Sequence, residues 1–178
     1  MIRRLAPAVA FVLLPALGAC SAPAKEPMLK DPARWPLAKL EELPRPAGLP
    51  QEAERALARI KVGSIGLTAW INSSGLCGLT GPGWSMNADL TKSDMAEPTQ
   101  EDGFSGPGEP QVGGAQESKV TLFCTPTRML IRVEGETSKP SVSGNAVAQI
   151  YRGGLNAVVG TPEARRESLP GATVTPAG

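Results

Sequence analysis

The sequence predicts a mainly β fold: a small disulfide-closed β-sandwich or meander with one short N-terminal helix and a long acidic loop. Apolar residues alternate with polar ones along 65–71 and through 119–134, which is the period of strands with one buried face. Cys77 and Cys124 are available to close the domain. Glycine and proline together make up about a fifth of the chain, and only seven residues are aromatic. This composition argues against a coiled coil, a collagen or an enzyme with a large aromatic core.

The composition also argues against several functions. The chain has no histidine, so histidine-based catalytic triads and histidine-ligated metal centres are excluded. A net charge of +1 provides no basic surface for nucleic acid. Gly103-Phe104-Ser105-Gly106 is one residue short of the Gly-x-Ser-x-Gly nucleophile elbow. We therefore expect no enzyme, no cofactor, no metal site and no nucleic-acid partner.

Residues 1–20 have the organisation of a secretory leader. Arg3 and Arg4 form a basic start, and a mostly apolar run of about 13 residues follows from Leu5 to Leu17. This run is too short to span a bilayer of about 30 Å as a permanent helix. The pattern predicts a signal peptide over residues 1–19.

The end of the leader is more specific. Leu17-Gly18-Ala19-Cys20 resembles the lipobox of bacterial lipoproteins: an aliphatic residue, two small residues and the cysteine that receives the lipid. The resemblance covers only about the first 20 residues. It implies cleavage before Cys20 and attachment of diacylglycerol to its thiol, so that acyl chains hold the protein on a membrane. The alternative is an ordinary secreted protein cut near Ala19.

The resemblance also implies a location. In lipoproteins of Gram-negative bacteria, a residue other than Asp after the lipidated cysteine permits transfer to the outer membrane, and Ser21 occupies that position. The expected location is thus the bacterial cell envelope, at the outer membrane in a Gram-negative organism, facing the periplasm or the surface.

Residues 20–50 are expected to form a tether between the lipid and the domain. The segment after Cys20 contains seven prolines, which resist both helix and sheet and favour extended polyproline conformation. At about 3.1 Å per residue, thirty residues would reach roughly 90 Å. Trp35 and Leu37 are candidate docking points within it, and a proline-rich recognition motif is the alternative interpretation.

Residues 51–60 are expected to form a helix, the first element of a domain over 51–160. Pro50 suits the first helical position. Ala53, Ala56, Leu57 and Ile60 recur at i, i+3, i+4 and i+7, which places them on one helical face. Ten residues are too few for a stable isolated helix. This face must therefore pack on the domain that follows.

The clearest prediction is a hairpin over 119–134. A turn at 125–128 would pair Cys124 with Met129, and the same register pairs Leu122 with Ile131 and Val120 with Val133. The opposite face is mostly polar, although Phe123 and Leu130 interrupt it.

Other elements of the domain are less clear. Residues 65–71 predict a strand, 76–86 one irregular strand ending at Trp84, and 155–159 a last strand. Residues 142–151 fit either a strand or a short helix, and 161–178 are expected to be a disordered tail because they combine three prolines with little apolar content.

Cysteine usage supports a translocated protein. With Cys20 carrying lipid, Cys77 and Cys124 remain, and two cysteines in an exported chain suggest one disulfide. The alternative is a pair of free buried thiols. Cys124 belongs to the inward face of the predicted hairpin, where Cys77 could meet it.

The loop 88–118 is the candidate contact surface. A structureless loop of this length is usually functional or disordered. It carries a single base, Lys92, and the acids considered as contact residues are Asp89, Asp94, Glu97, Glu101, Asp102 and Glu109. Clustered carboxylates suit Ca²⁺, but their spacing fails the EF-hand pattern. A solvated acidic loop is therefore favoured over a calcium site.

These observations together predict a lipid-anchored cell-envelope protein with a non-catalytic structural or protein-interaction role. Its expected partners are the membrane, through acyl chains on Cys20, and another envelope protein. The alternative is a small ligand- or cation-binding module that uses the loop 88–118.

Overall fold

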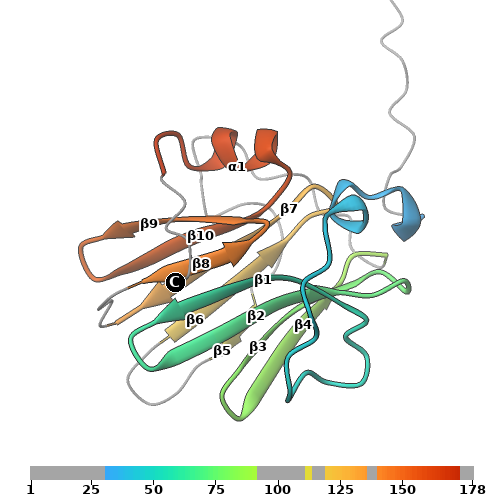
Figure 1. The fold of residues 1–178 in the computed structure, drawn as a ribbon, viewed down its shortest axis with the longest axis horizontal. Helices are drawn as coiled ribbons and strands as arrows, with labels where there is room; N and C mark the ends of the chain where they lie inside the picture. Colours follow the sequence, from blue (N-terminus) through green and yellow to red (C-terminus); the bar gives the residue numbers. More distant parts are fainter. Residues whose placement is uncertain (1–30, 92–110, 114–118, 136–139, 173–178) are drawn as a thin grey trace, which may run out of the picture.

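Two five-stranded antiparallel sheets pack face to face in the computed structural model, which describes residues 31–91, 111–113, 119–135 and 140–172 (Figure 1). The first sheet contains, in order, β4 (Trp84–Asp89), β3 (Leu76–Gly81), β2 (Ile65–Ile71), β1 (Arg55–Val62) and β8 (Ser141–Gly144). The second contains β5 (Gln111–Gly113), β6 (Lys119–Cys124), β7 (Arg128–Glu134), β10 (Gly154–Gly160) and β9 (Ala146–Tyr151). The predicted mainly β, disulfide-closed class is confirmed.

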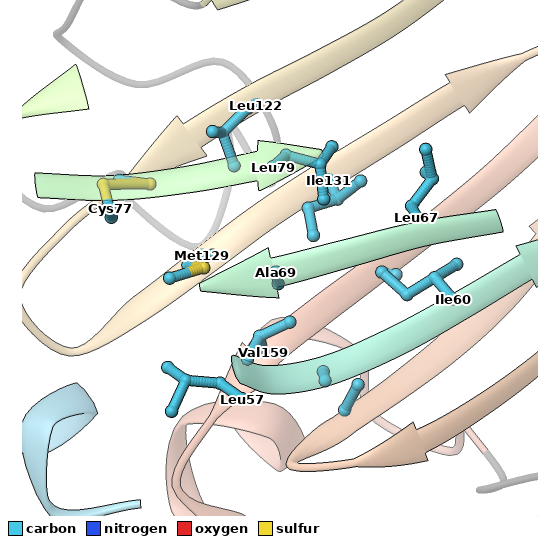
Figure 2. Close-up of a cluster of buried hydrophobic side chains, with 14 of the residues drawn as sticks. Leu57, Ile60, Leu67, Ala69, Cys77, Leu79, Leu122, Met129, Ile131 and Val159 are labelled. Atoms are coloured by element: carbon cyan, nitrogen blue, oxygen red, sulfur yellow. A yellow bond between two sulfur atoms is a disulfide. The ribbon is translucent and has the colours of Figure 1, made fainter. Parts of the chain in front are cut away.

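The core lies between the two sheets (Figure 2). One side chain of every two along each strand points inward, because successive residues of a strand face opposite sides. From the first sheet, Ile60, Leu67 and Leu79 are buried, and from the second, Leu122 and Ile131. Each of these side chains is at most 1% exposed, so the two inner faces exclude solvent from the core at these positions.

The hairpin over 119–134 has the predicted register. β6 and β7 pair Cys124 with Met129, Leu122 with Ile131 and Val120 with Val133. All six side chains belong to the main core cluster, so the predicted inner face is confirmed. The outer face of the hairpin is less exposed to solvent than expected, because Phe123 and Leu130 are also buried, in a second apolar cluster.

The other segments predicted to be strands, or left ambiguous, are also extended in the structure. β2 confirms the strand over 65–71, and β10 confirms the last one. The irregular strand expected over 76–86 is instead two strands, β3 and β4, joined by the two-residue turn Pro82-Gly83, with Gly83 at φ 77°. The ambiguous segment 142–151 is extended: β8 and β9 are separated by Asn145 alone, where the chain passes from the first sheet to the second.

The helix expected over 51–60 is wrong, because residues 55–62 form the strand β1, which lies between β2 and β8. A β-bulge explains the misleading spacing. Ala56 pairs with Trp70 and Ala58 with Ala69, so Leu57 is an extra residue with no partner on β2. A bulge lets neighbouring side chains face the same side, and it converts an alternating pattern into one that resembles i, i+3, i+4, i+7.

The tether expected over 20–50 is too long, because residues from 31 onwards belong to the domain. Short 3₁₀ turns form at η2 (Pro32–Arg34) and η3 (Pro36–Lys39). Trp35 and Leu37 are fully buried in the main core cluster. Prolines suit such turns because they fix φ and need no backbone donor. Residues 20–30 lie outside the described part.

The disordered tail expected from residue 161 is corrected over 162–172. Pro162–Ser168 form the helix α1, whose first turn is capped by Thr161, which accepts from the Ala164 backbone N–H at 3.3 Å. After it, Leu169 is buried in the second apolar cluster, with Phe123, Leu130, Val147 and Val158. A buried leucine and a capped first turn stabilise a segment whose composition alone predicts disorder.

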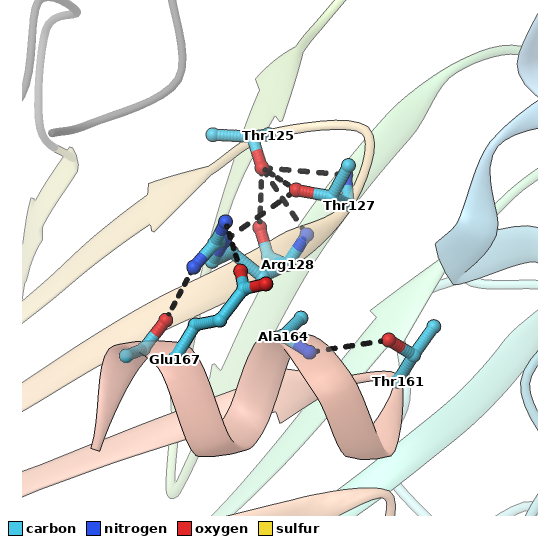
Figure 3. A network of polar contacts seen from close by, with 7 residues as sticks. Thr125, Thr127, Arg128, Thr161, Ala164 and Glu167 are labelled. Atoms are coloured by element: carbon cyan, nitrogen blue, oxygen red, sulfur yellow. Dashed lines mark hydrogen bonds and ion pairs between the residues drawn. The ribbon is translucent and has the colours of Figure 1, made fainter. Parts of the chain in front are cut away.

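A polar network fastens α1 to the β6–β7 turn (Figure 3). The Arg128 guanidinium donates to Ser168 Oγ at 2.6 Å and forms an ion pair with Glu167 at 3.4 Å. Thr125 Oγ1 accepts from the Arg128 backbone N–H at 3.1 Å. The Arg128 side chain is only 13% exposed, so this contact is a structural fastening between the helix and the turn.

Both ends expected for the loop 88–118 are corrected. Asp89 is the last residue of β4, where it pairs with Leu76, and Leu90 is fully buried. β5 forms at the other end and pairs with β6. Residues 92–110 and 114–118 lie outside the described part.

Candidate functional site

The predicted disulfide is present. Cys77 of β3 and Cys124 of β6 are bonded, with their Cα atoms 6.6 Å apart and both side chains fully buried (Figure 2). The bond therefore joins the two sheets across the core, and not two strands of one sheet. Its chemistry is structural in this setting, because neither sulfur is open to solvent.

The N-terminal segment closes the end of the sandwich near this disulfide. The Trp35 ring lies beside Gly75 in the β2–β3 turn, where an added Cβ would be 3.2 Å from the ring. The Leu37 backbone N–H donates to the Pro126 carbonyl in the β6–β7 turn at 3.3 Å. Trp35 and Leu37 thus contact turns of both sheets. We call these two side chains the N-terminal plug.

Of the acids expected to form a contact surface, the structure describes Asp89. Asp94, Glu97, Glu101, Asp102 and Glu109 lie outside the described residues, as does Cys20. Asp89 is described, and its Oδ1 accepts from the backbone N–H and the hydroxyl of Thr91, at 3.1 and 2.6 Å. In the described ranges, no group of three or more acidic or cysteine side chains could hold a metal ion.

A groove of about 470 Å³ runs over the outer face of the first sheet. β1 forms its floor, with β2 and β8 on either side. Its polar side chains come from β1, β2, β8 and the β1–β2 turn: Arg59, Lys61, Ser64, Thr68, Ser141 and Ser143. Pro46 contributes an apolar wall. The volume is in the range of sites that bind small molecules or a few side chains of a partner.

The charge in this groove is positive. Arg59 and Lys61 are both exposed, and no carboxylate is among the lining residues. Arg59 donates from its guanidinium to the Pro44 carbonyl at 2.9 Å, which restrains its long side chain. The groove therefore presents two cations and several hydroxyls to solvent, an arrangement suited to an anion.

Sequence reasoning missed this groove. Arg59 and Lys61 fall in the segment expected to be helical, and Ser141 and Ser143 lie about 80 residues further along the chain. A signal was present, since Ala58, Ile60 and Val62 alternate with the two cations, which is strand periodicity. The pairing of β1 with β8 could not be inferred from the residues alone.

The comparisons with known proteins provide no relative. No family model, no curated protein and no solved structure matches this chain. No helix in the described part of the chain is long and apolar enough to cross a membrane. The functional argument therefore depends on the residues and on their arrangement.

Proposed function

We propose that this chain is a lipid-anchored protein of the bacterial cell envelope whose β-sandwich is a non-catalytic interaction module. The observation that carries the proposal is the Cys77–Cys124 disulfide across the core. Structural disulfides persist in oxidising compartments outside the cytoplasm. The lipobox-like Leu17–Cys20 segment supplies the matching export signal and the lipid attachment site.

The packed N-terminal segment limits how far the domain can lie from the membrane. With residues 31–50 folded onto the sandwich, only the chain from Cys20 to Asp31 can act as a spacer. About eleven residues at no more than ~3.6 Å each reach roughly 40 Å, less than half the reach expected for a tether through residue 50. A partner of the domain would therefore be a membrane-associated protein or one close to the membrane surface.

The groove supports an interaction role. It is the concave surface described above, and its residues bring positive charge and hydrogen-bonding hydroxyls to one place. Asp89, the described member of the predicted acidic loop, already caps a turn through Thr91. The cation-binding alternative therefore gains no support from the described residues.

Lipid attachment is tested by comparing Cys20→Ser with Ser21→Ala, a matched change at the neighbouring position. The unmodified chain and Ser21→Ala should fractionate with membranes and have an intact mass that includes acyl chains, because both keep the thiol. Cys20→Ser should lose both properties. A soluble unmodified chain without lipid, or a Cys20→Ser variant that keeps the acyl mass, would contradict the anchor.

The interaction role is tested by crosslinking in intact cells, followed by mass spectrometry of the captured proteins. We expect a specific envelope protein to be crosslinked at residues of the sandwich. Covalent turnover of a substrate by the purified chain would contradict the non-catalytic assignment.

A further inference from the structure

We infer that the groove on the first sheet is the docking site for an acidic, extended segment of a partner protein. The inference rests on the proposed interaction role and deepens it by naming the chemistry of the partner. It begins from the placement of two cations on one strand. Arg59 and Lys61 are alternate residues of β1, so both side chains project from the outer face of the sheet.

Neither cation is neutralised within the described part of the chain. The ion pairs there involve other residues, and neither Arg59 nor Lys61 takes part in one. The Arg59 side chain is held by the Pro44 carbonyl, whereas the Lys61 side chain has no hydrogen-bond partner among the described residues. A pair of exposed cations without internal carboxylates attracts an external anion, and a restrained arginine loses less freedom on binding.

Hydroxyl groups flank both cations. Across the sheet, Arg59 is opposite Thr68 and Ser143, and Lys61 is opposite Gly66 and Ser141. Within the described residues the hydroxyls of Ser64, Thr68, Ser141 and Ser143 make no hydrogen bond, so all four are available to a ligand. Hydroxyls can donate to carboxylate or carbonyl oxygens and can also accept from amide N–H groups. The groove thus offers both kinds of partner that a peptide needs.

The composition of the groove favours a peptide over other polyanions. None of its lining residues is aromatic, so the stacking that nucleic-acid bases require is missing. Two cations are also few for a nucleic acid, whose affinity depends on many phosphate contacts.

The position of the groove argues against a lipid headgroup. The groove includes Ser64 of the β1–β2 turn, whereas the N-terminal plug lies at the β2–β3 turn, at the other end of β2 (Figure 1). The chain enters the domain at the plug end, so an anchor before residue 31 would place that end toward the membrane.

Strand geometry predicts the spacing of the acids. Alternate residues of a strand are about 6.8 Å apart, so we expect about this separation between the backbones of Arg59 and Lys61 in β1. An extended peptide running along β1 would place carboxylates at the same interval when acids occupy alternate positions. Adjacent acids would instead point to opposite sides of the peptide. The preferred partner segment therefore carries Glu or Asp at i and i+2.

The test uses the full-length chain purified in detergent and two fluorescent peptides of equal composition. One repeats Glu-Ser four times, and the other repeats Glu-Glu-Ser-Ser twice and has no acids at i and i+2. Fluorescence anisotropy should show tighter binding of the alternating peptide, and its affinity should fall as salt is raised. Equal binding of the two peptides would overturn the spacing argument and with it the extended docking mode.

Lys61→Gln is the informative variant, with Lys39→Gln as its matched control, because Lys39 is an exposed lysine of η3 outside the groove. Lys61→Gln should weaken binding of the alternating peptide by up to about fivefold, the upper end for one exposed ion pair. Adding Arg59→Gln should increase the loss further, to at most about 30-fold. Lys39→Gln should bind like the unmodified chain. Unchanged melting curves confirm that Lys61→Gln is folded.

Two further probes separate other partners from an acidic peptide. A sulfated oligosaccharide or phosphatidylglycerol vesicles that bind through Lys61 while the alternating peptide does not would overturn the inference. So would no peptide binding at low salt. These outcomes differ from failure of the proposed function, because peptide binding in detergent does not depend on where the chain is located or on whether Cys20 carries lipid.

Discussion

The Trp70 indole lies across Gly78 on the outer face of the first sheet, and a Cβ atom added at Gly78 would be only 2.1 Å from Trp70 Cζ2. The two residues are directly opposite each other on β2 and β3. Trp70 is fully buried, and its Nε1 donates to Thr80 Oγ1 at 3.0 Å. The missing side chain of Gly78 therefore makes the space that the indole occupies.

Gly78→Ala should destabilise the domain by about 1–3 kcal/mol, the usual cost of forcing extra volume into a packed site. Chemical denaturation with tryptophan fluorescence as the probe measures this loss. Gly66→Ala is the matched control, since Gly66 lies in a strand of the same sheet and an added Cβ there meets nothing within 4 Å. Equal stability of both variants would show that the indole is not held against Gly78.

Removal of the disulfide should also weaken the fold. In the chain-entropy model, a crosslink between residues 47 apart contributes about 4 kcal/mol. Cys124→Ala should therefore lower the free energy of unfolding by about 2–5 kcal/mol. Thiol titration supplies the check: the native chain should release no thiol from Cys77 or Cys124 with a reductant alone, because both are buried, and should release two when denaturant is added. Rapid reduction without denaturant would contradict this burial.

Where apolar residues recur at every second position of two neighbouring strands, the sequence is sufficient to predict how the strands pair. In the hairpin over 119–134, six apolar residues meet in one register, and a slip of one residue would move all of them to the wrong face. The opposite result at 51–60 has a local cause. The extra residue Leu57 breaks the alternation of β1, so the buried positions resemble one face of a helix.

Long-range packing accounts for the remaining differences. Prolines between 31 and 50 predict an extended tether, but Trp35 and Leu37 insert into a core formed by residues far along the chain. Gly78 resembles a break in a strand until its partner Trp70 is known. The groove likewise depends on the pairing of β1 with β8, and nothing local to Arg59 or Lys61 predicts Ser141 and Ser143 beside them.

Asn145 should stabilise the bulge in β1. Its backbone N–H and its side-chain Nδ2 both donate to the Leu57 carbonyl, at 3.0 and 2.8 Å, and Nδ2 also donates to the Glu41 carbonyl at 2.7 Å. Asn145→Ala should cost about 1–2 kcal/mol, because the side-chain donor to two carbonyls is lost. Asn145→Asp should cost more at neutral pH, since a carboxylate only accepts hydrogen bonds and would face two other acceptors. Thermal melts at pH 7 should rank Asn145→Asp below Asn145→Ala in stability, and both below the unmodified chain. An aspartate variant as stable as the unmodified chain would contradict this ranking.

The N-terminal plug gives the sharpest test of where the domain begins. Trp35 and Leu37 are fully buried in the core cluster, next to the turns that flank the disulfide. Trp35→Ala should lower the free energy of unfolding by about 3–5 kcal/mol, as is usual when a buried aromatic side chain is removed. Ala33→Ser, an exposed change in the adjacent turn η2, should leave it unchanged. Denaturant titrations of both variants supply the comparison.

A second effect should follow from the position of the plug. Because Trp35 closes the end of the core near Cys77 and Cys124, Trp35→Ala should let a reductant reach the disulfide in the absence of denaturant, while Ala33→Ser should not. If residues 31–50 were instead a free tether, Trp35→Ala would change neither the stability nor the rate of reduction. The two measurements are independent, since one reports the packing energy of the indole and the other reports solvent access to the sulfur atoms that it helps to cover.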